Sequence, residues 1–323
     1  MIYTAATKML GRVDGTTPDV ARFHQVIQYI DLQKEEIILP EGYKGYVFLA
    51  FATNEGVRRN QGRVGAANGH ASIAQAMASL PVHFENVILF HGGVIACEDA
   101  NLEAAQQELA IYVEKILASN CTPIVLGGGH DVTYGHHLGI KNFVHKAAGG
   151  AKIGIINIDA HFDLRPIDPN IGASSGTSIW QIATEAAQQN QHFQCLALGI
   201  QKYGNTKLLF DLAQQFGVDY VLGEQFNYDE RGDIIARVKA FADSVDYVYL
   251  TVCMDVFAAC YAPGVSATPL NGVVPDHVFM SVFDEIVKSP KLIALDFAEV
   301  NPEFDVDLRT AKLAASMIFR TIS

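Results

Sequence analysis

The chain has 323 residues, half of them hydrophobic, and its formal net charge of −12 disfavours a nucleic-acid partner, because the 23 basic residues are dispersed and phosphate binding needs them clustered. The N-terminus lacks a basic segment followed by an apolar run, and no apolar stretch reaches the roughly 18 residues that span a bilayer. Five scattered cysteines argue against a disulfide framework, so we expect a cytoplasmic protein with no membrane partner.

The order of apolar and helical patterns along the chain predicts the fold class. Residues 1–42 are mixed in character, with a turn and helix start at 15–19, and we expect them to pack as an N-terminal extension on the rest. The clearest helical pattern runs from Asn101 to Ala118, where apolar residues recur at about 3.6-residue spacing. The expected strands are Tyr46 to Phe51, Val87 to Phe90, Pro123 to Leu126, Ile153 to Ile158, Cys195 to Leu198, Asp219 to Leu222, Tyr247 to Val252 and Leu292 to Phe297. Strands alternating with helices predict one α/β domain over 1–323, a three-layer α-β-α arrangement with a mainly parallel eight-stranded sheet and helices on both faces.

Four of these apolar runs end in side chains that can bind metals. The run 153–158 is followed at i, i+2 and i+4 by Asp159, His161 and Asp163, which an extended segment would place on one face. The ends of three other runs carry His130, Cys253 with Asp255, and Glu299. Because the carboxyl ends of parallel strands meet at one edge of a sheet, we expect these groups to converge on one crevice.

The donor types indicate a particular metal chemistry. Two imidazoles and several carboxylates form a hard, mostly oxygen-donor set, which suits Mn²⁺ or a similar ion better than structural zinc. That set is too large for one ion with an open position, whereas two ions bridged by shared carboxylates would use all of it. Two such ions can activate a water near neutral pH. The sequence therefore predicts a hydrolase of a small molecule.

These segments resemble the four signatures of the ureohydrolase superfamily of arginases and agmatinases. They are Gly127-Gly128-Gly129-His130, Asp159-Ala160-His161-Phe162-Asp163, the Asp255 segment, and Ala298-Glu299-Val300-Asn301-Pro302. The resemblance covers about residue 43 to the C-terminus in the right order. Within the superfamily the chain is most similar to formimidoylglutamases, which hydrolyse a linear amidine in histidine degradation. The segments that carry this finer resemblance are 56–66, 163–165, 174–177, 199–201 and 261–267.

The resemblance implies a role for each matching residue. His130, Asp159 and Asp163 would hold one Mn²⁺, while His161, Asp255 and the shared Asp159 would hold the other. Asp163 would also carry a proton from the attacking water to the departing nitrogen. Glu299 would bind the planar amidinium of the substrate through two parallel hydrogen bonds, and Ser175 lies in a segment that would contact substrate.

Two positions depart from the family pattern. The third signature usually supplies Asp-x-Asp, with the first Asp bridging both metals, but here it reads Cys253-Met254-Asp255. A protonated Cys253 leaves the site short of one charge, a thiolate shifts its preference toward softer ions, and a buried thiol without metal contact is the third reading. The first two readings put full occupancy by two Mn²⁺ in doubt. The arginase proton-shuttle histidine is replaced by the segment 174–177, as in formimidoylglutamases.

Substrate and activity remain open between three readings. N-formimino-L-glutamate carries two carboxylates and needs cationic partners, for which Arg165 is the first candidate and Arg58, Arg59 and Arg63 are weaker ones. An agmatinase or guanidinobutyrase activity would need a differently charged pocket. A metal-poor relative that binds a ligand without catalysis is the third reading, and Cys253 supports it. We further expect a homo-oligomer. His136 and His137 are read as structural or supporting residues.

Overall fold

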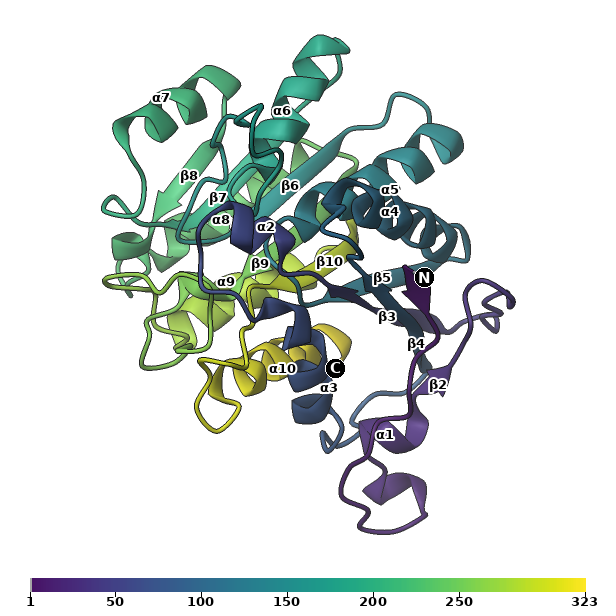
Figure 1. The fold of residues 1–323 in the computed structure, drawn as a ribbon. Coiled ribbons are helices and arrows are strands. Elements are labelled where there is room, and N and C mark those ends of the chain that lie inside the picture. Colours follow the sequence, from purple (N-terminus) through teal and green to yellow (C-terminus); the bar gives the residue numbers. More distant parts are fainter. Residues whose placement is uncertain (1) are drawn as a thin grey trace.

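The protein, described over residues 2–323 in a computed structural model, is built on one sheet with helices on both sides (Figure 1). The strands follow the order β1-β4-β3-β5-β10-β9-β6-β7-β8, and β2 pairs with β4 off this path. Their bounds are β1 Tyr3–Thr4, β2 Gln28–Tyr29, β3 Lys44–Ala52, β4 Val87–Ala96, β5 Cys121–Leu126, β6 Ile153–Ile158, β7 Gln194–Ile200, β8 Asp219–Leu222, β9 Tyr247–Cys253 and β10 Leu292–Ala298. Every strand pair is parallel except β1 with β4. The predicted mainly parallel α/β fold is confirmed.

The helices divide between the two faces of the sheet. Their bounds are α1 Phe23–Val26, α2 Glu55–Arg59, α3 Gly69–Met77, α4 Leu102–Ala118, α5 Val132–Ala147, α6 Ser178–Gln188, α7 Lys207–Phe216, α8 Arg231–Asp243, α9 His277–Val287 and α10 Arg309–Ile322. One apolar core joins α3, α8, α9 and α10 to the sheet, and a second core joins α4, α5, α6 and α7 to its other face. Strand alternation feeds both cores: in β10, Leu295 and Phe297 face the first while Ala294 and Ala298 face the second.

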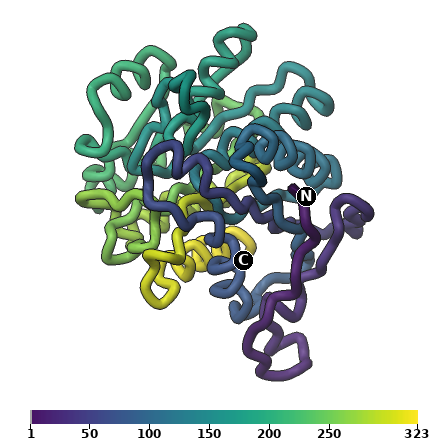
Figure 2. Tube along the Cα trace, in the orientation of Figure 1, coloured from purple at the N-terminus to yellow at the C-terminus, as the bar shows by residue number. Residues whose placement is uncertain are grey.

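The expected count of eight strands is wrong, because the N-terminal segment adds two more. All eight expected strands are present, and β1 and β2 pair along the outer edge of β4, where the purple trace of Figure 2 runs. Two-residue strands are too short to give an alternating pattern in the sequence. β4 also continues past Phe90 through two glycines. At Gly93, where φ is 111°, a Cβ would lie 2.6 Å from Thr4 O, so the glycine lets β1 approach.

The predicted helix at Asn101 to Ala118 is α4. Asn101 caps it by accepting a hydrogen bond from Ala104 N at 3.0 Å, and its buried face packs on α5 and the sheet. None of the helices formed by residues 2–323 combines the length and apolarity needed to cross a bilayer.

The four strands that end in ligand-type residues are neighbours in the middle of the sheet. They follow the order β5-β10-β9-β6, and Phe297 of β10 lies level with Leu126 of β5 and Val252 of β9. Val252 in turn lies level with Ile158 of β6. The four strands therefore end side by side, and the segments that follow them meet at one place.

Candidate active site

A cavity of about 220 Å³ lies where these four strands end. It is lined by the nine side chains that were the first candidates for metal or substrate binding: His130, Asp159, His161, Asp163, Arg165, Ser175, Cys253, Asp255 and Glu299. Parts of the chain separated by up to 169 residues thus share one crevice, as expected from the parallel topology. Their functional roles stay predictions.

The imidazole nitrogens and carboxylate oxygens of the cavity lie 2.7–3.4 Å apart, close enough to bind the same cation. His130 Nδ1 is 2.9 Å from Asp159 Oδ2 and 2.7 Å from Asp163 Oδ2. His161 Nδ1 is 3.4 Å from Asp159 Oδ1 and 3.3 Å from Asp255 Oδ2. Asp159 therefore stands between the two imidazoles, with one oxygen near each ring.

The segment after β6 reaches this arrangement through a turn rather than as an extended strand, so the proposed i, i+2, i+4 alternation is wrong in its mechanism. The strand stops at Ile158, and His161 N donates to Asp159 Oδ1 at 2.8 Å, which bends the chain. Asp163 has a left-handed backbone with φ at 49°. Such conformations are costly for non-glycine residues and concentrate at functional sites. Glu299 shows the same feature, with φ at 69°.

The glycines before His130 allow close approach of backbone segments. Gly127 and Gly128 have φ of 81° and 77°, and a Cβ on Gly128 would lie 2.7 Å from Phe51 O. At Gly129 a Cβ would meet an Asp131 carboxylate oxygen at 2.3 Å. The loop can therefore pack tightly and present His130 to the cavity, which explains three consecutive glycines without a phosphate ligand.

Buried polar atoms without partners show that the cavity suits a metal ion. His130 Nδ1, Asp159 Oδ2 and Asp163 Oδ2 are buried, and the nitrogen lies 2.7–2.9 Å from the two oxygens without a well-directed hydrogen bond, while the buried Asp255 Oδ1 has no hydrogen-bond partner among the described residues. Orphaned buried groups of this kind are costly unless another species satisfies them. Two sets of converging donors are present, His130 with Asp159 and Cys253, and Asp159 with His161 and Asp255. Because Asp159 belongs to both sets, the arrangement fits two neighbouring cations that share one carboxylate.

Cys253 lies inside the donor set and is not remote from it. Its Sγ is within 4.8 Å of the ligand atoms of His130 and Asp159. Burial, then the nearby Asp159 and Asp255 carboxylates, raise the pKa of its thiol well above the ordinary value. The thiol is therefore protonated at neutral pH unless a cation binds beside it.

Burial and neighbouring charges shift the pKa values of the titratable groups in the cavity. Burial and then Asp159 raise the pKa of Asp163 to about 6, and the same two causes raise the pKa of Asp255. Burial opposes charge on Asp159 as well, but the His130 and His161 imidazoles lower its pKa overall. For His130, burial alone would lower the pKa, whereas the Asp163 and Asp159 carboxylates raise it. The site thus concentrates negative charge that a divalent cation can neutralise.

Glu299 faces the cavity with only one free oxygen. Its Oε1 accepts a hydrogen bond from His130 N at 2.7 Å, its buried Oε2 has no well-directed hydrogen bond among the described residues, and the Ser266 hydroxyl lies close enough to interact with the carboxyl group. Burial and then Asp255 raise the pKa of Glu299 to about 8. Oε2 can accept from a cationic substrate. For an amidinium to donate two parallel hydrogen bonds, Oε1 would have to accept from the substrate and from His130 N at the same time. The expected bidentate contact is therefore less favourable than a single bond to Oε2.

Of the four candidate arginines, only Arg165 keeps its guanidinium free of ion pairs and hydrogen bonds to other groups of residues 2–323. Arg58 is exposed and binds Glu55. Arg63 lines the cavity, but its guanidinium donates to Val265 O at 2.5 Å and lies 4.2 Å over the Phe304 ring. These contacts favour a structural role for Arg63.

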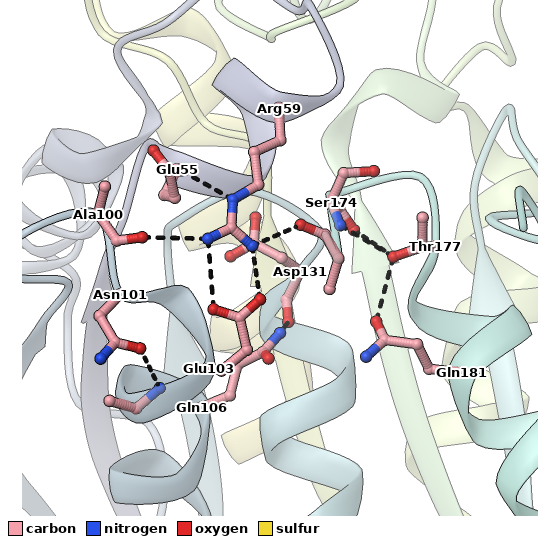
Figure 3. A network of polar contacts seen from close by, with 12 residues as sticks. Glu55, Arg59, Ala100, Asn101, Glu103, Gln106, Asp131, Ser174, Thr177 and Gln181 are labelled. Atoms are coloured by element: carbon pink, nitrogen blue, oxygen red, sulfur yellow. Dashed lines mark hydrogen bonds and ion pairs between the residues drawn. The ribbon is translucent and has the colours of Figure 1, made fainter. Parts of the chain in front are cut away.

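Arg59 is committed to a polar network beside the cavity (Figure 3). Its Nε donates to Glu55 at 2.8 Å, and its Nη1 donates to Glu103 at 2.6 Å and to Ala173 O at 3.0 Å. The network joins α2, the start of α4 and the loop that leads to Ser175. Arg59 therefore positions cavity walls and is not available to substrate.

Some residues at the site were not singled out from the sequence. Asn60, Gln61, Leu209 and Ser266 also line the cavity. Beneath it, Thr251 of β9 and Asp296 of β10 are fully buried in otherwise apolar strands. Asp296 could have been found from the sequence, because a carboxylate inside an apolar strand needs a buried partner.

Comparison with known proteins adds the family. The model of the arginase family matches residues 45–323. The chain belongs to the arginase family. Two relatives extend the match over nearly the whole chain: a formimidoylglutamase of Clostridium tetani is 40% identical, covering 97% of this chain and 92% of its own length. One of Chromobacterium violaceum is 41% identical, with 95% and 94% covered.

Solved structures of arginase-family proteins share the fold. The formimidoylglutamase of Bacillus subtilis superposes with a TM-score of 0.79 at 19% identity, over 96% of this chain and 94% of that one. The Trypanosoma cruzi formiminoglutamase, solved with Mn²⁺, gives a TM-score of 0.72 at 23% identity, over 86% and 92%. The predicted superfamily is confirmed.

Proposed function

We propose that this arginase-family chain hydrolyses N-formimino-L-glutamate to L-glutamate and formamide, in the degradation of histidine. The observation that carries the proposal is the shared cavity, in which two donor sets joined by Asp159 lie beside a free Glu299 oxygen and the unpaired Arg165. Near-full-length relatives named formimidoylglutamase support the substrate. Location in the cytoplasm and assembly into a homo-oligomer stay predictions.

The residues divide the work by position. His130, Asp159, Asp163 and Cys253 would hold one divalent ion, and Asp159, His161 and Asp255 the other, with Mn²⁺ the ion we propose. When bound, such ions supply a water of lowered pKa and positive charge opposite the developing negative charge. Glu299 Oε2 accepts from the cationic formimino group and orients its carbon toward the metal side of the cavity.

Two further groups complete the proposed chemistry. Asp163 lines the cavity with an oxygen close to His130, so it is placed to accept a proton from the attacking water and return it to the departing nitrogen. Arg165 is exposed at the cavity and can bind a substrate carboxylate. Ser175 is buried at the cavity wall and can bond the same end of the substrate.

The test compares substrates on purified protein supplied with Mn²⁺. Formamide and glutamate are measured with N-formimino-L-glutamate, and urea is measured with arginine, agmatine and 4-guanidinobutyrate. We expect formamide and glutamate in equal amounts and no urea. Urea from a guanidine substrate would support the agmatinase-type alternative instead. No product from any substrate, with metal bound or absent, would support the non-catalytic relative that Cys253 suggests.

A further inference from the structure

Asn60, at the end of α2, lies in the wall of the cavity together with Arg165 and Ser175. The main chains of Asn60 and Ser175 are bonded to one group, because Gly56 O accepts from Asn60 N at 3.0 Å and from Ser175 N at 3.1 Å. Gly176 O in turn accepts from Arg165 N at 3.0 Å. The end of α2 is therefore joined by backbone hydrogen bonds to the loop that carries Arg165 and Ser175.

The side chains of Asn60 and Arg165 meet over Gly176. A Cβ on Gly176 would lie 3.0 Å from Asn60 Oδ1 and 3.1 Å from Arg165 Cδ. Glycine leaves room there for both side chains at once. The carboxamide of Asn60 is therefore a direct neighbour of the Arg165 side chain.

The Asn60 side chain is held in place but not occupied. Its carboxamide makes no hydrogen bond within residues 2–323, and the neighbouring Arg165 guanidinium is free as well. The preceding residue, Arg59, is fixed by its bonds to Glu55 and Glu103 (Figure 3), so the main chain at Asn60 is anchored before any ligand arrives. A pre-positioned donor with no internal partner can bond a ligand at a low cost in conformational entropy.

The charges in the cavity restrict which ligand group these donors can bind. Four carboxylates line the cavity: Asp159, Asp163, Asp255 and Glu299. A carboxylate of a ligand is repelled by these groups and is attracted to the Arg165 guanidinium. The Asn60 carboxamide can donate to the same carboxylate, because it adds no negative charge beside Arg165.

We propose that Asn60 is a specificity-determining residue whose Nδ2 donates, beside Arg165, to the substrate carboxylate that is distal from the formimino group. Exposure assigns the distal carboxylate: Ser175 is 6% exposed, whereas Asn60 is half-buried and Arg165 is exposed, so the last two lie nearer the mouth. The formimino carbon must reach the buried Glu299, which leaves the other end of the substrate toward the mouth. The inference rests on the proposed function and adds the residue that selects a glutamate derivative.

The chain offers matched variants for the test. Asn60→Leu keeps a similar size and removes the donor, and Asn60→Asp keeps the shape but replaces the donor with a charged acceptor. Asn68→Asp is the control for the added charge, because Asn68 is exposed and does not line the cavity. Asn60 is also the last-turn cap of α2, so thermal unfolding of each variant shows whether it is folded before kinetics are compared.

A pair of substrates decides the inference. With Mn²⁺ supplied, kcat and KM are measured for N-formimino-L-glutamate and for N-formimino-L-2-aminobutyrate, which lacks the distal carboxylate. For the glutamate derivative we expect KM to rise about 10–100-fold in Asn60→Leu, and at least as much in Asn60→Asp because of repulsion. For the aminobutyrate derivative KM should stay within about threefold in both variants. Asn68→Asp should match wild type with both compounds.

The outcomes separate this inference from the proposed function. Equal rises in KM for the two compounds, or no rise for the glutamate derivative, overturn the role of Asn60 even if wild type releases formamide. If wild type releases no formamide, calorimetric binding of L-glutamate to wild type and to Asn60→Leu decides instead. Tighter binding to wild type rejects only the hydrolase proposal and keeps the carboxylate site, whereas equal or undetectable binding overturns both.

Discussion

Replacing Arg59 by Met tests how strongly the network of Figure 3 supports the walls of the cavity. Methionine keeps an unbranched stem and removes every donor. The side chain of Arg59 is 11% exposed, so water cannot easily replace its bonds. The variant leaves the buried Ala173 carbonyl without its side-chain donor and takes from Glu55, only 8% exposed, one of its two arginine partners.

The magnitude follows from the exposure of each partner. A bond from a charged donor to a buried group contributes about 1–3 kcal/mol, which applies to Ala173 and in part to Glu55. Glu103 is 55% exposed and Ala100 is exposed, so these contacts are discounted to about 0–1 kcal/mol together. The expected loss of unfolding free energy is about 2–4 kcal/mol. For a chain of this length that corresponds to a fall in Tm of about 3–6 °C.

The assay is thermal unfolding together with steady-state kinetics. Arg58→Met is the matched control, because Arg58 lies in the same helix, is 62% exposed and bonds to Glu55. We expect little change in Tm for the control, and a higher KM for Arg59→Met because the loop to Ser175 loses an anchor. Equal Tm for both variants and wild type would refute the reasoning.

Three further predictions concern the cavity itself. Cys253→Asp restores a carboxylate beside the metal ligands, so Mn²⁺ occupancy and formamide release should rise together. Elemental analysis and activity assays check this prediction, and a lower Mn²⁺ occupancy in the variant would contradict it. Arg165→Lys should raise KM about 10–100-fold through loss of a bidentate contact while Mn²⁺ affinity stays within about threefold, and unchanged kinetics would remove Arg165 from the account. Metal-free protein should lose stability as pH rises from about 6 to 9. The pKa values of Asp131 and Glu299, raised to about 7 and 8, and the raised pKa of His130 all mean that the folded state holds protons that the unfolded state releases. Calorimetry in EDTA should show a lower Tm at the higher pH, and the opposite trend would reject these shifts.

The sequence predicted the central strands and the convergence of the ligand residues well, for a physical reason. Strands buried on both faces read as continuous apolar runs, and parallel strands bring their carboxyl ends to one edge. Asp159, His130, Asp255 and Glu299 therefore could be placed together before any geometry was known. The edge strands β1 and β2 could not be predicted, since two residues are too few for an alternating pattern and β1 also depends on the close approach at Gly93.

The hydrogen-bond partners of the arginine side chains could not be predicted from the spacing of residues in the sequence. From the sequence, Arg59 and Arg63 were possible substrate ligands. The structure shows that Arg59 donates to Glu103 and that Arg63 donates to Val265 O. In the same way the turn at Asp159 and the left-handed Asp163 replace the expected extended segment. These features depend on neighbours distant in sequence, which a local pattern does not contain.

Anomalous diffraction from crystals grown with Mn²⁺ tests the metal centre most directly. We predict two peaks in the cavity that share Asp159, one beside His130 and Cys253 and one beside His161 and Asp255, with the first weaker because of the thiol. No peak among these side chains, in crystals that take up Mn²⁺ elsewhere, would contradict the account.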